Sequence, residues 1–277
     1  MNAPTISFIV AAYQEPERTR MCLEAIARQV YPYYEVIISE DGRLEAKHAS
    51  LRGDRGDTVK WVPRYYHDVV DGVPVRNIPA VANQGAAAAT GDILCFLQQD
   101  HIIQPDYGLW LVRCMTSNDI MFGLLDRRDN VTLSDLDALV HNLHLPEAQP
   151  RFDMVLDQGR RLLVPFDDWR LTDGFDFSIA RARWQPMDAS FIGPSHAILD
   201  AMITYRMAGL RFVLNPMMRL WHWEHPSRDP ANVDELIAAS YRKMQEKWGE
   251  AVWTSVLVPL LYDFREERKQ LQERLSL

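Results

Sequence analysis

Cysteine is scarce in this 277-residue chain, and the few that occur are too scattered to build a site. Cys22, Cys95 and Cys114 form no CxxC pair and are odd in number. The sequence therefore indicates neither a zinc-binding cysteine cluster nor a disulfide framework. We expect all three to be reduced thiols that pack as small hydrophobic groups. With 47% hydrophobic residues, the chain is expected to fold on an apolar core.

The chain also lacks an excess of basic residues and a long apolar run. Its net charge is −8 and its pI about 5.5, whereas a general nucleic-acid binder normally has a basic surface. The apolar stretch at 251–261 is too short to span a bilayer, which takes about 20 residues. The N-terminus runs into a predicted strand without a signal peptide. We expect no transmembrane segment, and a cytoplasmic location or a peripheral one at a membrane.

Glycine-rich phosphate-binding loops are missing as well. No GxGxxG follows the first predicted strand, and GxxxxGK[ST] does not occur. Dinucleotide-binding Rossmann folds and P-loop proteins hold phosphates with these loops. If this chain binds a nucleotide, we therefore expect acidic side chains and a metal ion to hold it.

Strands and helices alternate along the first half of the sequence. Apolar runs predict buried strands at 6–12, 35–39 and 93–97. Further strands are predicted at 59–66, where the pattern is mixed, and at 120–124, with helices at 15–29, 78–90 and 105–116. An exposed helix and loop are expected around 47–56. This alternation predicts an α/β fold with a mostly parallel, doubly wound sheet.

The second half is expected to be less regular. Residues 125–172 are polar and broken by prolines, and predict a helix near 133–143 with irregular segments that cover the site. Further along we expect a strand at 175–180, a helix at 199–208 capped by Gly209, a short strand at 211–214 and terminal helices at 232–248 and 260–275.

Polar side chains follow four of the predicted strands. They are Tyr13-Gln14-Glu15, Glu40-Asp41-Gly42, Gln98-Gln99-Asp100 and the segment from Trp221 to His225. The first three sets should converge, because the carboxyl ends of parallel strands lie on one edge of a sheet. Asp41 could by itself be a turn residue before Gly42. His101 is expected to be an edge residue, not a ligand, and Trp221 to Pro226 to form a loop.

The order and spacing of these motifs resemble the GT-A glycosyltransferases of family 2. Residues 6–15 resemble the family's opening strand with its YN-E end, 35–42 its V-I-V-DDGS strand, 82–85 its ARN-G helix start, and 91–100 its G-E-Y-I-L-F-L-D-A-D strand. Residues 187–191 stand at its FDE-F segment, 200–209 match its D-L-x-x-R-x-x-x-G helix, 222–226 its histidine segment and 247–249 its tail. The resemblance extends over residues 5–249.

This resemblance implies a GT-A fold and an enzyme of glycosyl transfer. The GT-A domain would span 1–228, with a nucleotide-sugar-binding half at 1–124, an acceptor-side half at 125–228 and a C-terminal helical extension at 229–277. A UDP-sugar would donate its sugar, with inversion, to the hydroxyl of a glycan, a lipid-linked intermediate, a protein or a modified nucleic-acid base. A nucleotidyltransferase shares the sheet architecture, but residues 14–17 do not form its glycine-rich, basic loop.

The resemblance also implies roles for individual residues. Ala12, Tyr13, Glu15 and Asp41 would hold the base, with Asp41 accepting a hydrogen bond from uracil N3–H, while the turn from Asn83 to Gly85 would lie near the ribose and Gln98 and Gln99 near the sugar nucleotide. Asp100 would ligate a divalent cation, Mn²⁺ or Mg²⁺, with His222 as a further ligand. Such a cation stabilises the charge that grows on the leaving diphosphate. Alternatively, His222 only packs against the neighbouring tryptophans.

Two departures from the family pattern bear on the chemistry. The DxD motif reads Gln98-Gln99-Asp100, so the first carboxylate is an amide, which lowers the expected metal affinity and allows metal independence. The acidic pair that supplies the general base is replaced by Ala197-Ile198. Substitutes are Asp188, by its place in the FDE segment, His196, by its pKa near neutrality, and Asp200, otherwise a structural acid of its helix. A retaining enzyme, or a degenerate relative that only binds sugar nucleotide or glycan, would need no base.

Overall fold

The computed structural model describes the chain in segments. They are residues 3–13, 15–41, 51, 59–64, 68–70, 73–129, 164–165, 175–192, 196–224 and 233–252. The predicted helix near 133–143, the predicted C-terminal helix at 260–275 and most of the helix and loop around 47–56 lie outside these residues. The predicted domain boundary at 228/229 also lies outside them.

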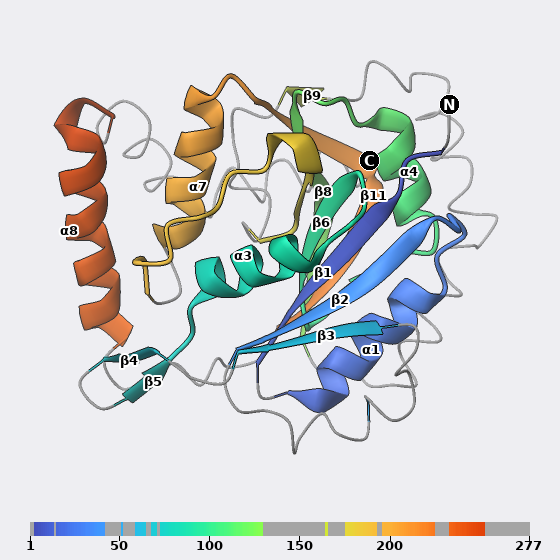
Figure 1. Cartoon of the computed structure of the whole chain (residues 1–277), viewed down its shortest axis with the longest axis horizontal. Coiled ribbons are helices and arrows are strands. Elements are labelled where there is room, and N and C mark those ends of the chain that lie inside the picture. Colours follow the sequence, from blue (N-terminus) through green and yellow to red (C-terminus); the bar gives the residue numbers. More distant parts are fainter. Residues whose placement is uncertain are drawn as a thin grey trace.

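Most predicted strands and helices of the first half are present with nearly the predicted bounds (Figure 1). In chain order they are β1 (Ile6–Ala12), α1 (Pro16–Ala27), β2 (Tyr34–Asp41), β3 (Val59–Arg64), β4 (Asp68–Val70), β5 (Val73–Val75), α3 (Ile78–Ala88), β6 (Ile93–Gln98), β7 (His101–Ile103), α4 (Tyr107–Cys114) and β8 (Asp119–Asp129). The remainder are β9 (Val164–Pro165), β10 (Phe177–Ala180), the 3₁₀ turn η2 (Arg181–Arg183), α7 (His196–Met207), β11 (Arg211–Glu224) and α8 (Val233–Val252).

The described strands form one large sheet, and β4 and β5 form a separate hairpin. The large sheet has the order β3-β2-β1-β6-β10-β8-β11-β7, with β9 paired to β11. Strands β3, β2, β1 and β6 are parallel, as are β8 and β11, whereas β10, β7 and β9 pair antiparallel. The predicted α/β architecture with a mainly parallel sheet is confirmed. Strand order reverses between β1 and β6, which creates a topological switch point at their carboxyl ends.

Helices cover both faces of the sheet, as the alternating side chains of β1 require. Ile6, Phe8 and Val10 pack with α1 and α4 in one apolar cluster, whereas Ile9 packs with α3 and α7 in a second. Figure 1 shows α1 and α4 on one side of the sheet and α3 and α7 on the other. Helix α8 adds an outer layer against α7, where Met244 joins a third cluster.

Small residues in α3 let this helix lie unusually close to the sheet. A Cβ atom at Gly85 would approach Ile9 Cγ2 to less than the 3.0 Å that real Cβ contacts respect. The turn into β6 is fixed by Glu35, which accepts hydrogen bonds from Ser7 Oγ at 2.6 Å and from the backbone N–H of Thr90 at 2.5 Å. Although burial opposes ionisation, these bonds hold the pKa of Glu35 below its ordinary value.

Strand β11 is much longer than the predicted strand at 211–214. The Asn215-Pro216 pair looks like a strand end in the sequence, but a register shift between Asn215 and Arg219 absorbs it and pairing with β8 continues to Glu224. The prediction of a loop at 221–226 is therefore wrong for residues 221–224, which belong to β11. His222 lies in the strand, opposite His101 of β7. Three-residue strands such as β7 carry too little periodicity to be predicted.

The cysteines agree with the prediction of reduced thiols. All three are free, Cys22 and Cys95 are buried, and burial raises the pKa of Cys95 to about 12. In the part of the chain that the structure describes, no helix is both long and apolar enough to cross a membrane.

Candidate active site at the carboxyl ends of β1, β2 and β6

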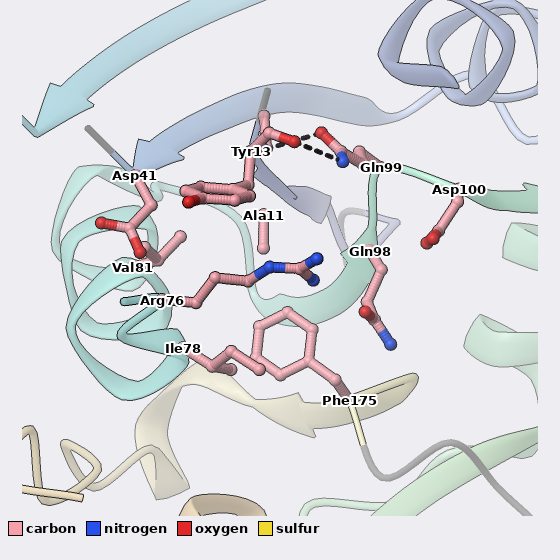
Figure 2. A pocket seen from close by; sticks show the side chains of 11 residues that line it. Ala11, Tyr13, Asp41, Arg76, Ile78, Val81, Gln98, Gln99, Asp100 and Phe175 are labelled. Carbon is pink, nitrogen blue, oxygen red and sulfur yellow. Dashed lines mark hydrogen bonds between the residues drawn. The ribbon is translucent and has the colours of Figure 1, made fainter. Parts of the chain in front are cut away.

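A pocket opens at the switch point of the sheet, where sequence reasoning placed the polar strand ends (Figure 2). It is open to solvent, and its volume is about 410 Å³ when the open space at its mouth is included. It is lined by Ala11, Ala12, Tyr13, Asp41, Arg76, Ile78, Val81, Gln98, Gln99, Asp100 and Phe175. The three predicted sets of strand-end residues thus meet in one place.

Asp41 lies at one end of this pocket, against the N-terminus of α3. Its Oδ2 accepts a hydrogen bond from the backbone N–H of Asn77 at 2.8 Å, and the residue is only 3% exposed. Asn77 in turn caps the helix through Ala80 N–H at 3.0 Å. The positive end of α3 stabilises the Asp41 carboxylate.

Gln99 holds the chain where it leaves β1. Its Oε1 accepts from Tyr13 N–H at 2.6 Å, and its Nε2 donates to Tyr13 O at 2.7 Å. Only an amide can do both, because a carboxylate has no proton to donate. Gln99 therefore positions the backbone of the pocket wall, a role that the sequence did not reveal.

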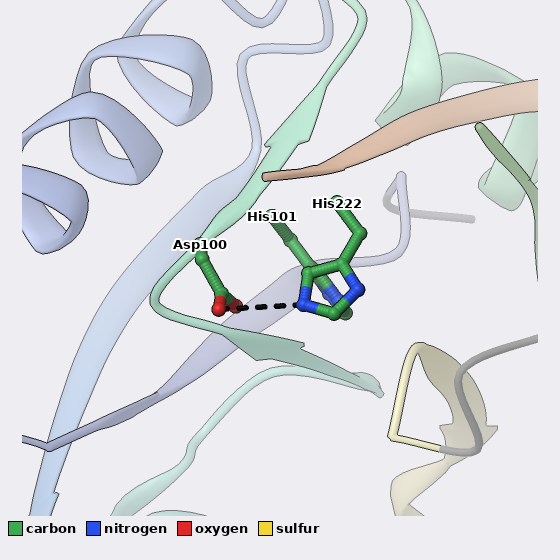
Figure 3. A group of neighbouring side chains, drawn as sticks. All are labelled: Asp100, His101 and His222. Carbon is green, nitrogen blue, oxygen red and sulfur yellow. Dashed lines mark ion pairs between the residues drawn. The ribbon is translucent and has the colours of Figure 1, made fainter. Parts of the chain in front are cut away.

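Asp100 and His222 meet beside the pocket (Figure 3). The distance from His222 Nε2 to Asp100 Oδ2 is 3.3 Å, which fits two ligands of one cation with metal–ligand distances of about 2.1 Å. Arg18 Nη1 lies 3.9 Å from the same carboxylate oxygen, and the Arg18 guanidinium stacks on Trp223 at 4.7 Å. The oxygen and imidazole donors fit a divalent cation, but the nearby guanidinium lowers the affinity expected of the pair.

His101 lies within the same group, although its tautomer argues against a ligand role. Asp100, His101 and His222 offer ligand atoms within 4.8 Å of one another. However, His101 Nδ1 accepts a hydrogen bond from Gln98 N–H at 3.2 Å, so in the neutral ring the proton is on Nε2. His101 belongs to the terminal strand of the sheet, as an edge residue should, but it is fully buried.

Asp188 and Asp200 form a second group around Lys247 of α8. Lys247 Nζ lies 3.1 Å from Asp188 Oδ2 and 2.8 Å from Asp200, and Trp248 Nε1 donates to Asp200 Oδ1 at 2.9 Å. Burial opposes ionisation of Asp188, but bonds from Ser190 and Lys247 outweigh it and lower its pKa to about 2. Both acids therefore fasten α8 to the domain, and neither lines the pocket.

The other predicted residues have places of their own. Asn83 exchanges two hydrogen bonds with the backbone of Met187, both of 2.8 Å, and Gly85 packs on the sheet. Glu15 lies 3.9 Å from Arg18. Like Asn83 and Gly85, it does not line the pocket. His196 is the first residue of α7, and its side chain lies outside the described part of the structure.

Arg76 and Phe175 line the pocket without having been predicted. Arg76 immediately precedes the N-cap of α3. Its position next to a predicted helix start could have indicated from the sequence that it lies near the pocket. Phe175 comes from the distant segment before β10, so only tertiary structure brings it to the site.

Comparisons with known proteins give one partial sequence match and one match to a solved structure. No protein-family profile matches the chain. It is 31% identical over 109 residues, 39% of its length, to a Bacillus subtilis (strain 168) protein named "Putative glycosyltransferase EpsH". This match spans only 29% of that relative. A solved structure titled "Crystal Structure of a Mycobacterial Protein" matches with a TM-score of 0.52 and 19% identity, over 89% of this chain and 75% of that one, and supports the fold alone.

Proposed function

We propose that this chain is a GT-A glycosyltransferase that moves a sugar from a nucleotide-diphospho-sugar, specifically a UDP-sugar, to an acceptor hydroxyl. The observation that carries the proposal is the pocket at the switch point, which gathers Tyr13, Asp41 and Gln98 to Asp100. The partial similarity to a protein named as a glycosyltransferase supports the same class. So does the order of the family 2 motifs along residues 5–249.

In this proposal the nucleoside occupies the end of the pocket near β1 and β2. Asp41 accepts a hydrogen bond from uracil N3–H, and the backbone N–H of Asn77 at the start of α3 holds its carboxylate in place for that task. Tyr13 offers an aromatic ring beside it. Gln99, through its two bonds to Tyr13, keeps this wall in place.

Asp100 and His222 are the residues that would hold a divalent cation, Mn²⁺ or Mg²⁺. When bound, the cation would stabilise the negative charge that grows on the nucleoside diphosphate as the glycosidic bond breaks. His222 is kept in place by its strand pairing with His101. Gln98 supplies a neutral amide in place of the missing carboxylate, so the site offers the cation one negative ligand fewer and a lower affinity.

The acceptor's proton needs a base if the reaction inverts configuration. Asp188, with a pKa of about 2, is deprotonated at neutral pH but is a weak base. Asp200 is 2% exposed and hydrogen-bonded to Lys247 and Trp248. His196 is therefore the favoured base of the three in this proposal.

The pairing of Asp188 and Asp200 with Lys247 favours a second candidate function. This candidate is a degenerate relative that binds a sugar nucleotide or a glycan without transferring the sugar. Two of the three candidate bases, Asp188 and Asp200, pair with Lys247 and have a structural reason to be present. A binding protein would keep the pocket and need none of them.

The test separates binding from turnover. The protein is incubated with UDP-, GDP- and ADP-sugars and Mn²⁺, and release of nucleoside diphosphate is measured alongside binding by calorimetry. A transferase should release UDP from a UDP-sugar by slow donor hydrolysis. Binding without release would favour the degenerate relative, and no binding of any sugar nucleotide would contradict both. Pyrophosphate release from UTP and a sugar phosphate would indicate a nucleotidyltransferase.

A further inference from the structure

Arg76 places a guanidinium group inside the pocket. It comes from the residue before the N-cap of α3, lies over the ring of Tyr13 at 4.9 Å, and is only partly exposed. Figure 2 shows the side chain crossing the pocket between Tyr13 and Phe175, with its guanidinium directed toward Gln98. Among the described residues, no carboxylate forms an ion pair with Arg76.

The remaining charges of the pocket wall are engaged with other groups. Asp41 accepts from Asn77 N–H, and Asp100 lies against His222 and Arg18. At position 98 the chain has a neutral amide where the family resemblance leads one to expect a carboxylate. The pocket therefore has a neutral side chain at the place toward which the guanidinium points.

We propose that Arg76 binds the phosphate groups of the nucleotide, so that binding of a nucleoside diphosphate does not depend on the cation that Asp100 and His222 would hold. This inference rests on the proposed function and names the residue that supplies the positive charge. A guanidinium has five N–H donors in a planar fork that matches two phosphate oxygens and cannot lose its charge at any physiological pH. A carboxylate at position 98 would form an ion pair with this fork and compete with phosphate, whereas the neutral amide of Gln98 is a weaker competitor.

A purely structural role for Arg76 makes a different prediction. If the side chain only stacks on Tyr13 and fills the pocket wall, its removal should weaken uridine and UDP to the same extent. If it binds phosphate, its removal should weaken UDP and leave uridine unchanged. The ratio of the two affinities therefore separates these roles.

The experiment measures UDP and uridine binding to the full chain by isothermal titration calorimetry in EDTA. Wild-type protein should bind UDP at least tenfold more tightly than uridine. Arg76→Gln should reduce UDP affinity tenfold or more with uridine affinity unchanged, and Arg76→Lys should keep part of the difference. Arg113→Gln is the matched control, because Arg113 also stacks on an aromatic ring, that of Trp110 at 5.5 Å, but on α4 and outside the pocket.

Two results with the Arg76→Gln variant would overturn the inference while the proposed function stands. One is UDP binding by Arg76→Gln that equals wild type in EDTA, and the other is an equal loss of uridine and UDP affinity. UDP binding by wild type that appears only when Mn²⁺ is added would also overturn it. If wild type binds no nucleotide, with Mn²⁺ or without, the proposed function fails and the inference fails with it.

Discussion

Asp100 is the residue whose charge the proposed chemistry uses most directly. Its Oδ2 lies 3.3 Å from His222 Nε2, so both can contact one cation. Asp100→Asn keeps the shape and removes the charge, and should reduce Mn²⁺ affinity at least tenfold, since a hard cation prefers charged oxygen ligands. Paramagnetic resonance of free Mn²⁺ during a titration measures this.

Asp106→Asn is the control for that substitution. Asp106 accepts a hydrogen bond from Trp110 Nε1 at 2.9 Å on α4, outside the pocket. Mn²⁺ affinity should be unchanged in this variant. Equal affinities of wild type and Asp100→Asn would remove Asp100 from the metal site.

Gln99 shows how one amide can decide the shape of a site. Gln99→Glu replaces the Nε2 donor by a second oxygen that faces Tyr13 O at the 2.7 Å position. Because a partly buried carbonyl loses its donor, we expect a loss of about 1–3 kcal/mol in the free energy of unfolding. Urea denaturation measures it. Gln185→Glu, at an exposed position, should stay within about 0.5 kcal/mol of wild type.

At the scale of elements, α3 packs so closely on β1 that no side chain fits at position 85. Gly85→Ala would place a Cβ against Ile9 Cγ2, and should destabilise the fold by about 1–3 kcal/mol. Chemical denaturation checks this value. In the double variant with Ile9→Ala the clash is absent, so its loss should be smaller than the sum of the two single losses. Additive losses would contradict the close approach.

Helix α8 is held to the domain by Lys247 through Asp188 and Asp200. Lys247→Met should lower the free energy of unfolding by about 1–2 kcal/mol, less than for a fully buried pair because Lys247 is partly exposed. Lys243→Met, one helical turn earlier, is a comparison variant that leaves both aspartates paired.

The pH dependence of this contact follows from two opposite shifts. The pKa of Asp188 is lowered to about 2, so its stabilising effect is complete above its unfolded pKa of about 4 and is lost as the pH falls toward 2. Burial opposes the charge of Lys247, but its bonds to Asp200 and Asp188 raise its pKa, so its effect persists until the pH exceeds 10. The stability difference between wild type and Lys247→Met should be constant from pH 5 to 9 and shrink below pH 4. A difference that grows on acidification would contradict this pairing.

For the whole molecule, the proposed pocket predicts selective stabilisation by nucleotides. A ligand at 100 times its Kd stabilises the folded state by about 2.7 kcal/mol, which should raise the Tm of a chain this size by roughly 5 °C. UDP should do so, whereas CDP at the same concentration should do so less, because cytosine N3 carries no proton for Asp41. Differential scanning calorimetry compares them, and equal shifts would argue against the role of Asp41.

Much of the fold could be predicted, because its signals are local. The apolar run of β1 and the period of α1 depend only on nearby residues, and the strand–helix alternation then implies a mainly parallel sheet. The convergence of Tyr13, Asp41 and Gln98 to Asp100 followed from that topology. From the sequence, the strand that begins at Arg211 is predicted to end at Leu214. Strand β11 continues through Pro216 because it pairs with β8, a distant segment.

The sequence by itself determined the strand–helix order and the polar residues at the carboxyl ends of β1, β2 and β6, since side-chain periodicity and strand direction suffice for both. Only the tertiary structure decided which partner each polar group has. It paired Asp100 with His222, tied Asp188 and Asp200 to Lys247, and put Arg76 in the pocket. The physical reason is that hydrogen bonds and ion pairs act over a few ångströms, between residues that lie tens to more than a hundred positions apart in the chain.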